Sequence, residues 1–513
     1  MDQDVCGEPT AISAEWMTDA LEAAGVARGA AVVRLTFDGL IGTGQMGRNA
    51  RFTLEWDDPE GRPASVVGKF PSDDPTARAT GFDKGSYAKE WSFYRDLHPT
   101  VHVRTPTVWV NRFDEAGKNF VIIMEDMRDS AQGDQFRGLT FDEAMLAVEQ
   151  AVAFHAPLWG DASLMALETE TGDEAVAKLS GYYGALVELS LARLGDLVDD
   201  EVRALARQFT PYVSQWAQGT GTPLTLAHMD YRPDNFLFGR TPDAPPLAIV
   251  DWATITFGLG THDIAYMIGG GFEPAQRRRV ERALVTRYCN LLNAAGVAYS
   301  EEDCWRDYRV SSLWGVLMSI IATMLAQETE RGNRMLATML RRHAHHAIDC
   351  DAISLLEALG TAEARGTLYE AVGGADGLRR LADAWHHRVI ADEVVGHAFS
   401  HGFHPDHTER LAAYWAEALG GPAMYSERYG DETTVVKMHS GNGAHDEMDR
   451  NAIACFGLAL ADVGLSDDVA LTQVLHDYFA WATTTTMSRY HESADDVPEG
   501  LRVPRWGWDG LQC

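Results

Sequence analysis

The sequence predicts a multidomain protein in which a bilobal α+β domain is followed by an all-α domain. The chain has 513 residues, more than one hydrophobic core usually serves. In its first two thirds, strand-like alternation precedes helical stretches and a loop that carries acidic and amide side chains. Its last third holds ten of the 18 histidines. The two parts therefore differ in chemistry as well as in pattern.

The composition is that of a globular protein, with 46% hydrophobic and 23% charged residues. The apolar stretch 310–326 is interrupted by polar residues and is too short to span a bilayer, so we expect a buried core helix. The first residues lack the basic and apolar regions of a secretory signal. A cytoplasmic location is the expectation.

The formal net charge of −32 disfavours nucleic acid and anionic membrane surfaces as partners, because binding phosphate needs clustered Lys and Arg. Such acidity is compatible with a cationic substrate and equally with solubility alone. The six cysteines are scattered without close pairs, which argues against a disulfide framework or a cysteine-based zinc site.

A glycine-rich segment lies between two strand-like runs near the N-terminus and contains Gly42, Gly44 and Gly47. Glycine lets backbone N–H groups approach phosphates and adopts positive φ. A glycine-rich turn alone is more often just a turn. We nevertheless expect these three residues to contact a nucleotide, given the residues that follow.

One lysine, Lys69, interrupts an otherwise apolar strand, and a buried amine needs a partner. Glu90 lies in the next helical segment and is the natural candidate, because a Lys–Glu pair holds the α- and β-phosphates in kinase folds. The alternative is that Glu90 is a solvated helix charge. Residues 120–127 then predict a buried strand and a hinge, where the backbone of Glu125 and Met127 would meet adenine.

The segment 226–236 and the apolar strand before Asp251 predict a phosphoryl-transfer site. Asp230 is the expected general base. Asn235 and Asp251 are the expected ligands of Mg²⁺. His228 is expected to orient the loop by hydrogen bonding, and His155 to be a packed structural residue.

These motifs resemble the aminoglycoside phosphotransferase and protein-kinase-like superfamily, and are similar to ecdysteroid and aminoglycoside kinases. The resemblance covers residues 30–350 and also includes Lys-Phe-Pro at 69–71, Lys-Glu-x-x-Phe-Tyr at 89–94 and Ala-Gln-Gly-Asp-Gln at 131–135. It implies a protein-kinase-like fold that uses ATP and Mg²⁺ to phosphorylate a small-molecule alcohol. By the same resemblance Asp263 buttresses the catalytic loop. Met229 departs from the family, which usually has Gly there, and its side chain could crowd the loop.

The domain boundaries follow from these limits. We expect the kinase-like domain at 1–348, with its first lobe ending near residue 127, and a linker at 349–366. Within that linker a short helical piece is closed by Gly360, and a second break follows at Gly366. The second domain then spans 367–495 and an aromatic tail spans 496–513.

The histidine enrichment suggests metal or haem binding. For a bare metal, the strongest local candidate is the pair His397 and His401, followed by His404 and His407. Pro405 interrupts the helix there, and no acidic residue lies at a companion spacing. For most of these histidines, the simpler interpretation is that they lie on the protein surface.

A different pattern fits better, because residues 368–378, 391–394, 419–427, 438–439 and 449–450 resemble a group II truncated haemoglobin. The resemblance runs from 367 to about 490 and implies an all-α truncated globin domain that binds haem b. It places His439 on the iron, which leaves a sixth position for O₂, NO or CO.

The distal side departs from this family. His386 stands where Tyr is frequent, Phe399 where Tyr or Phe is usual, and His407 where a small residue is usual. Ile453 replaces the family's distal Trp. His407 is therefore expected either to donate to bound oxygen or to bind iron itself, while the alternative for His386 is an ordinary helix residue.

The leading hypothesis is thus an ATP- and Mg²⁺-dependent small-molecule kinase fused to a haem-binding globin that regulates it. In the second, the globin is the active oxygen- or NO-handling domain and the kinase-like half is a binding module. In the third, the globin fold lacks haem and serves as a structural domain. The tail is expected to pack over one domain, or alternatively to bind a partner through its tryptophans.

Overall fold

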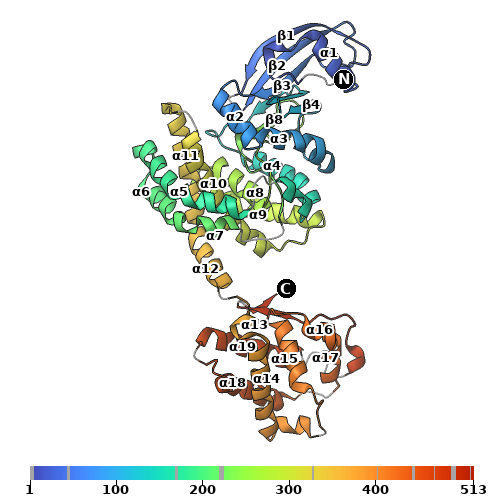
Figure 1. Cartoon of the computed structure of the whole chain (residues 1–513), viewed down its shortest axis with the longest axis vertical. Helices are drawn as coiled ribbons and strands as arrows, with labels where there is room; N and C mark the ends of the chain where they lie inside the picture. The colour runs from blue at the N-terminus through green and yellow to red at the C-terminus, as the bar shows by residue number, and fades with distance from the viewer. Residues whose placement is uncertain are drawn as a thin grey trace. The chain divides into compact units, whose positions relative to one another are not determined.

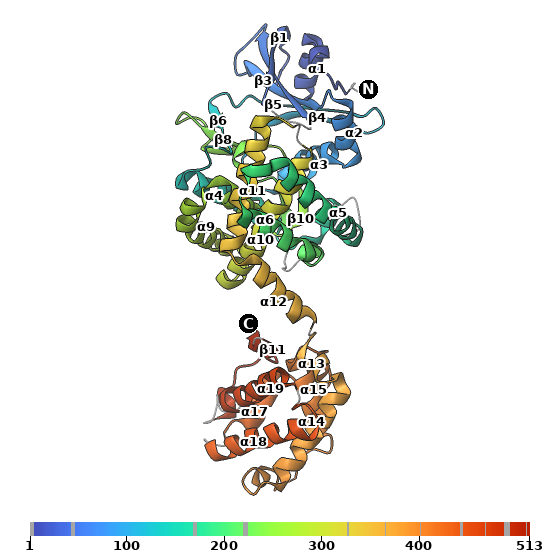
Figure 2. The same cartoon turned by 90° about the vertical axis from the view of Figure 1, so that its left-hand side faces the viewer.

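The computed structural model describes residues 5–42, 47–167, 172–218, 224–325, 328–364, 366–400, 402–441, 445–466, 468–486, 493–508 and 510–512. The chain forms two compact units, Met1–Glu357 and Ala358–Cys513. Figures 1 and 2 draw the first from blue to yellow and the second in orange and red. Among the described residues, no helix is both long and apolar enough to cross a membrane.

An antiparallel sheet with strand order β1-β2-β3-β5-β4 builds the first lobe of unit 1. Its strands are β1 (Val32–Ile41), β2 (Gly47–Trp56), β3 (Ser65–Pro71), β4 (Val108–Asp114) and β5 (Asn119–Glu125). Successive side chains of a strand point to opposite faces. In β3, Val66 and Phe70 pack in the core beside α1 (Ala14–Ala23), while Val67 packs toward the second lobe. Lys69 is in phase with Val67.

Two short helices follow β3, namely α2 (Pro75–Asp83) and α3 (Ser86–Ser92). The side chain of Asp74 accepts from Ala77 N and begins α2. Helix α3 continues into a π-helical turn at Phe93–Leu97 and buries Glu90. This helix therefore brings a carboxylate against the inner face of the sheet.

The second lobe is mainly helical (Figure 2). Its helices are α4 (Phe141–His155), α5 (Gly172–Leu194), α6 (Asp200–Phe209), α7 (Val213–Gln218), α8 (Gly260–Gly271), α9 (Pro274–Ala294), α10 (Glu301–Leu325) and α11 (Glu330–Asp349). A capping box between Thr140 and Glu143 begins α4. The apolar stretch lies in α10, where Leu313, Val316 and Ile320 are buried, so the predicted core helix is confirmed.

Short strands position the loops between the lobes. One sheet has the order β6-β8-β9, with β6 (Ser130–Gln132), β8 (Phe236–Gly239) and β9 (Leu247–Ile249), and β7 (Thr225–Ala227) pairs with β10 (Thr256–Gly258). The segment with Asp230 and Asn235 connects β7 to β8. Asp251 follows β9 directly.

Helix α12 (Ala352–Ala364) occupies most of the segment predicted as a linker. It continues through Gly360, so the predicted end of the helix at that glycine is wrong. A glycine inside a helix costs only about 1 kcal/mol relative to alanine, which the neighbouring apolar residues offset. The boundary between the compact units falls within α12, after Glu357.

Unit 2 is built of helices around one apolar core (Figure 1). They are α13 (Leu368–Ala371), α14 (Gly374–Ala391), α15 (His407–Ala418), α16 (Met424–Arg428), α17 (Glu432–His439), α18 (Asp446–Asp462) and α19 (Val469–Trp481). In the core, Phe456 stacks on Phe479 with ring centroids 4.1 Å apart, and Trp415 meets both rings edge-on.

The C-terminal tail folds back on unit 2 as a hairpin of β11 (Arg505–Gly507) and β12 (Gly510–Gln512). Trp506 is buried beside Tyr478 and Trp481. Trp508 Nε1 donates to the backbone oxygen of Gly366 at 2.9 Å. The described part of the tail thus packs on the helical unit. This agrees with the expectation that the tail packs over one domain.

Candidate functional sites in the two units

Lys69 lies between two carboxylates that come from distant parts of the chain. Its Nζ is 2.6 Å from Glu90 Oε2 and 2.9 Å from Asp251 Oδ1. Burial alone would lower the pKa of Lys69, but Asp251 and Glu90 together raise it above its usual value. The lysine is therefore a fixed cation, and the pairing with Glu90 expected from the sequence is present.

Gly47, the first residue of β2, lies beside Lys69. A Cβ on Gly47 would lie 3.2 Å from Phe70 O, which is tighter than most Cβ contacts, and 3.6 Å from the Lys69 side chain. Gly42 has φ +75°, a conformation that glycine adopts without strain. Gly44 lies outside the described residues. Of the two described glycines, Gly47 is thus the one whose lack of a side chain leaves room beside the lysine.

Glu125 and Met127 of the predicted hinge both accept hydrogen bonds from other residues of the protein. Glu125 accepts from Arg104 at 2.8 Å and from the backbone and hydroxyl of Thr107 at 3.0 Å. Met127 O accepts from Ser130 N at 2.9 Å. Because the Glu125 carboxylate is already engaged, any contact of this segment with a base would use the backbone, as the sequence suggested.

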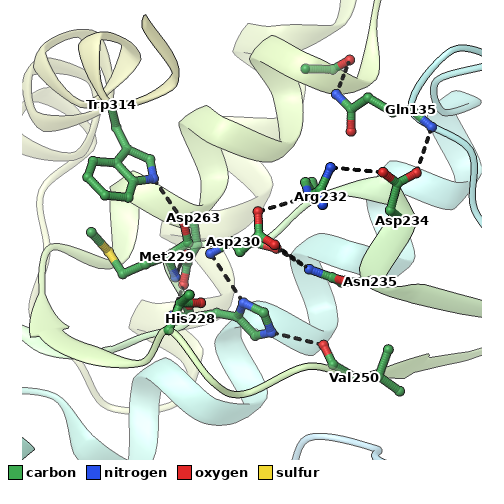
Figure 3. Close-up of polar contacts among 12 residues, drawn as sticks. Gln135, His228, Met229, Asp230, Arg232, Asp234, Asn235, Val250, Asp263 and Trp314 are labelled. Atoms are coloured by element: carbon green, nitrogen blue, oxygen red, sulfur yellow. Dashed lines mark hydrogen bonds and ion pairs between the residues drawn. The ribbon is translucent and has the colours of Figure 1, made fainter. Parts of the chain in front are cut away.

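Figure 3 shows the catalytic loop with Asp230 at its centre. Asn235 Nδ2 donates to Asp230 Oδ2 at 2.9 Å and to Asp230 O at 2.8 Å. This leaves the amide oxygen of Asn235 as its ligand atom for a cation. His228 links the two halves of the site, because its Nδ1 accepts from Asp230 N at 3.3 Å and its Nε2 lies 3.1 Å from Val250 O.

Asp263, in the first turn of α8, holds the loop in place through hydrogen bonds. Its carboxylate accepts from the backbone N–H of His228 at 2.7 Å and of Met229 at 2.8 Å. His155 lies 3.1 Å from the same carboxylate and 2.8 Å from Tyr288 Oη. Both Asp263 and His155 are fully buried. Their geometry is that of the supporting residues that the sequence predicted.

Two residues of this site were not singled out from the sequence. Arg232 Nε lies 2.8 Å from Asp230 Oδ1, and its Nη1 lies 2.8 Å from Asp234 Oδ2. Trp314 Nε1 donates to Met229 O at 3.0 Å (Figure 3). Arg232 could have been found from the sequence, because it lies inside the segment 226–236. Trp314 lies 85 positions from Met229 in the chain and had no local signal.

A cavity of about 580 Å³ lies next to the hinge. Tyr94, His98, Arg104 and Thr107 are among its lining residues. None of the predicted site residues lines it. The cavity is therefore separate from Lys69, its two carboxylates and the loop that carries Asp230.

In unit 2, the ring of His439 is fixed at the end of α17. Its Nδ1 is 2.8 Å from the backbone oxygen of Val435. A ring nitrogen that faces a carbonyl carries the proton, so Nε2 is left with its lone pair. The side chain is exposed rather than packed in the core. The backbone contact thus engages Nδ1 and leaves Nε2 as the ring nitrogen that could bind a metal centre.

Four rings from α14, α15 and the segment between these helices form a cluster. They belong to His386, Phe399, Phe403 and His407. The ring of His386 is 4.5 Å from Phe403 and 4.8 Å from His407, centroid to centroid. Burial lowers the pKa of His407 to about 4, and His386 and His439 add to the effect. His407 is therefore neutral at physiological pH. Phe403 was missed in the sequence because its loop has no periodic pattern.

Only one member of the alternative bare-metal pair lies among the described residues. His397 lies in a 3-10 helix, Val395–Phe399, rather than on the face of an α-helix, and His401 lies outside the described residues.

Two family models match the chain. Residues 141–302 match the phosphotransferase enzyme family, and residues 367–483 match the bacterial-like globins. The chain joins a phosphotransferase-family region to a globin-family region. None of the curated proteins matches the sequence.

Several solved structures are similar to one part of the chain. The haemoglobin of Chloroflexus aurantiacus is 27% identical and covers 24% of this chain and 97% of its own, with a TM-score of 0.21. An aminoglycoside 2′-phosphotransferase-IIIa bound to GDP is 14% identical and covers 64% and 99%, with a TM-score of 0.40. Plasmodium vivax ethanolamine kinase is 11% identical and covers 63% and 84%, with a TM-score of 0.37.

Several buried imidazole nitrogens in the described part of the globin region lack partners. Neither ring nitrogen of His386, nor Nδ1 of His407, has a hydrogen-bond partner among the described residues, although these atoms are buried. Buried polar atoms of this kind need an explanation. A prosthetic group with an iron-bound ligand would supply one. His439 Nε2 would then hold the iron, and His386, Phe399 and His407 would face the ligand.

Replacing Met229 in the phosphotransferase region with glycine is expected to stabilise unit 1 relative to alanine at the same position. Met229 has φ +66°, which costs a residue with a Cβ about 1–2 kcal/mol. Both variants remove the Met side chain, and only Gly removes the strain. We expect Met229→Gly to exceed Met229→Ala in free energy of unfolding by about 1 kcal/mol, measured in urea. Equal stability would show that the loop carries no strain there.

The stability of the globin region is expected to fall as pH rises from 5 to 8. Glu432 is 4% exposed, its Oε2 accepts from Tyr414 Oη at 2.7 Å, and burial raises its pKa to about 7 from 4.5. The protonated form is thus favoured by folding. Its contribution of about 3 kcal/mol is complete below pH 4.5 and is lost as pH rises through 7.

Substitution tests this dependence directly. Glu432→Gln should melt at the same temperature as the wild type at pH 5 and higher at pH 8. Glu427→Gln is the matched control, because Glu427 is exposed on the preceding helix. Equal pH dependence of the wild type and Glu432→Gln would exclude Glu432 as the cause.

Proposed function

We propose that this protein is an ATP- and Mg²⁺-dependent phosphotransferase that acts on a small-molecule hydroxyl and is joined to a haem-binding, gas-binding globin. The observation that carries the first half is the contact of Lys69 with both Glu90 and Asp251. Lys69 and Asp251 are 182 positions apart in the chain, so only the closed bilobal fold brings them together.

The roles follow from the chemistry of each group. Lys69 would bind phosphate oxygens, and Glu90 would keep its ammonium in place. Asn235 and Asp251 would hold Mg²⁺, which neutralises charge on the transferred phosphoryl group. Asp230 would accept the proton of the acceptor hydroxyl as the new O–P bond forms and the bond to ADP breaks. Arg232 keeps the Asp230 carboxylate oriented through the ion pair at 2.8 Å.

In the globin region, His439 would bind the haem iron and leave the opposite side for O₂, NO or CO. His407 and His386 would contact that ligand in place of the tyrosine and tryptophan donors of similar globins. The support is the Nδ1 contact of His439 with Val435 together with the unpartnered distal imidazoles.

Two measurements on the purified full chain test this proposal. Calorimetry should show ATP binding that strengthens with Mg²⁺, and acceptor-dependent ADP release should appear against a panel of hydroxylated amines and alcohols. The absorption spectrum should contain a Soret band. No ATP binding at millimolar Mg²⁺ would contradict the phosphotransferase, and a colourless protein that takes up no added haem would contradict the globin assignment.

We further propose that the ligand state of the globin changes phosphotransferase activity. The support is the covalent connection of the two regions through α12. Saturating MgATP must then change the gas affinity of the haem by the same factor as gas changes the affinity for MgATP. A coupling of about 1–3 kcal/mol would change each affinity roughly 5- to 150-fold. Equal affinities in the reduced, oxidised and gas-bound forms would show two independent regions.

A further inference from the structure

A group of possible metal ligands lies in the helical lobe of unit 1 and takes no part in the site around Asp230. It comprises Glu281 on α9, His346 on α11 and Cys350, which caps the C-terminus of α11. One ligand atom from each lies within 4.8 Å of the other two. A carboxylate, an imidazole and a thiol therefore converge inside the protein.

His346 lacks the partners that a buried imidazole requires. Its side chain is fully buried, and neither ring nitrogen has a hydrogen-bond partner in the described part of the chain. An unsatisfied buried polar group costs about 1–3 kcal/mol. A fold that retains such a side chain between two helices needs a compensating interaction.

The packing around His346 fixes the direction of the ring. A Cβ on Gly269 of α8 would lie 2.6 Å from His346 Nδ1, so only glycine leaves room for this edge. The ring of Tyr308 lies 5.1 Å away, centroid to centroid. The other edge carries Nε2, which lies 3.9 Å from Glu281 Oε2. The lone pair of a neutral ring is thus available toward the carboxylate.

Charged side chains lie beside this group. Arg277 is fully buried and forms ion pairs with Glu281 and Asp349. Arg278 pairs with Asp349 as well. Burial, with a further contribution from Glu281, raises the pKa of the Cys350 thiol to about 12. Without a cation the thiol stays neutral. With a divalent cation bound, the thiol would ionise and add its negative charge to that of Glu281 at the ion.

We propose that Glu281, His346 and Cys350 bind one Zn²⁺ that ties α9 to α11, with water as the fourth ligand. Sulfur, imidazole and carboxylate are the ligands that zinc takes in proteins, whereas Mg²⁺ prefers oxygen alone. Zinc bonds of about 2.0–2.3 Å place neighbouring ligand atoms roughly 3–4 Å apart, so the group needs only a small contraction. Binding releases the thiol proton of Cys350 to solvent.

Zinc content and zinc-edge X-ray absorption of the full chain test the proposal. After dialysis against metal-free buffer, the wild type should retain about one zinc per chain. Its absorption fine structure should contain one sulfur neighbour at about 2.3 Å and nitrogen or oxygen neighbours near 2.0 Å. The sulfur signal separates this site from the oxygen-rich site at Asp251 and from surface histidines.

Variants assign the ligands. Cys350→Ala and His346→Gln should each lose most of the zinc, while Cys289→Ala should keep it. Cys289 is the matched control, because it is also a buried free thiol but donates to Tyr299 O in another part of the core.

Two outcomes overturn the proposal. One is a wild type that neither retains zinc nor takes it up at micromolar concentration. The other is bound zinc without a sulfur neighbour. Both are measured on the wild type, so a variant that fails to fold leaves the answer intact.

Discussion

Replacing Asp230 with asparagine is expected to lower the rate of phosphotransfer by a factor of roughly 10²–10⁴. Asparagine keeps an oxygen that can accept from Asn235, so the loop should retain its geometry, but it cannot take the hydroxyl proton. The affinity for MgATP should stay near that of the wild type, because the base acts on the acceptor. Acceptor-dependent ADP release and calorimetry with MgATP measure the two effects separately.

Asp251→Asn supplies the contrasting variant. It removes a predicted metal ligand and one of the two ion pairs of Lys69, so the affinity for MgATP itself should fall. Asp263 anchors the loop rather than the nucleotide and is unsuitable as a control. If Asp230→Asn and Asp251→Asn weakened MgATP binding equally, the separate roles of base and metal ligand would be wrong.

Replacing His439 with alanine is expected to remove most of the bound haem, because the bond to iron is the attachment that this residue would supply. The ratio of haem to protein, measured from the absorption spectrum, should fall well below that of the wild type. His476→Ala is the matched control, because its side chain is 43% exposed on the same unit. Full haem occupancy in His439→Ala would exclude it as the iron ligand.

His407→Leu tests the opposite side of the haem. Loss of a hydrogen-bond donor should speed dissociation of bound oxygen, and loss of an iron ligand should change the resting spectrum. His386→Leu should have the smaller effect if His407 is the residue nearer the ligand. An unchanged spectrum and dissociation rate in His407→Leu would remove His407 from the distal pocket.

The sequence predicted those parts of the site that depend on short motifs. The pairing of Lys69 with Glu90 followed from a single charge in an apolar strand and a helix after it. The support of the catalytic loop by Asp263 came from a family pattern. Short motifs and their order along the chain are enough to predict such features.

Contacts between distant segments could not be predicted in the same way. Trp314 on α10 reaches the catalytic loop, and Phe403 joins the ring cluster from an irregular loop. The end expected at Gly360 was wrong because the helix-forming residues on both sides of it outweighed one residue's propensity. Glu281 and His346 are 65 positions apart, and nothing in either local sequence relates them.

The hydrogen bond from Trp508 to Gly366 has a practical consequence for dividing the protein. It brings the last strand pair of unit 2 back to the residues where the helical unit starts, so that unit begins and ends at one place. A fragment cut at residue 483, where the family match ends, would uncover Tyr478 and Trp481 and lose the contact of Thr433 with Pro498. A fragment of residues 358–513 keeps this closure, and we expect it to be more stable than the shorter fragment.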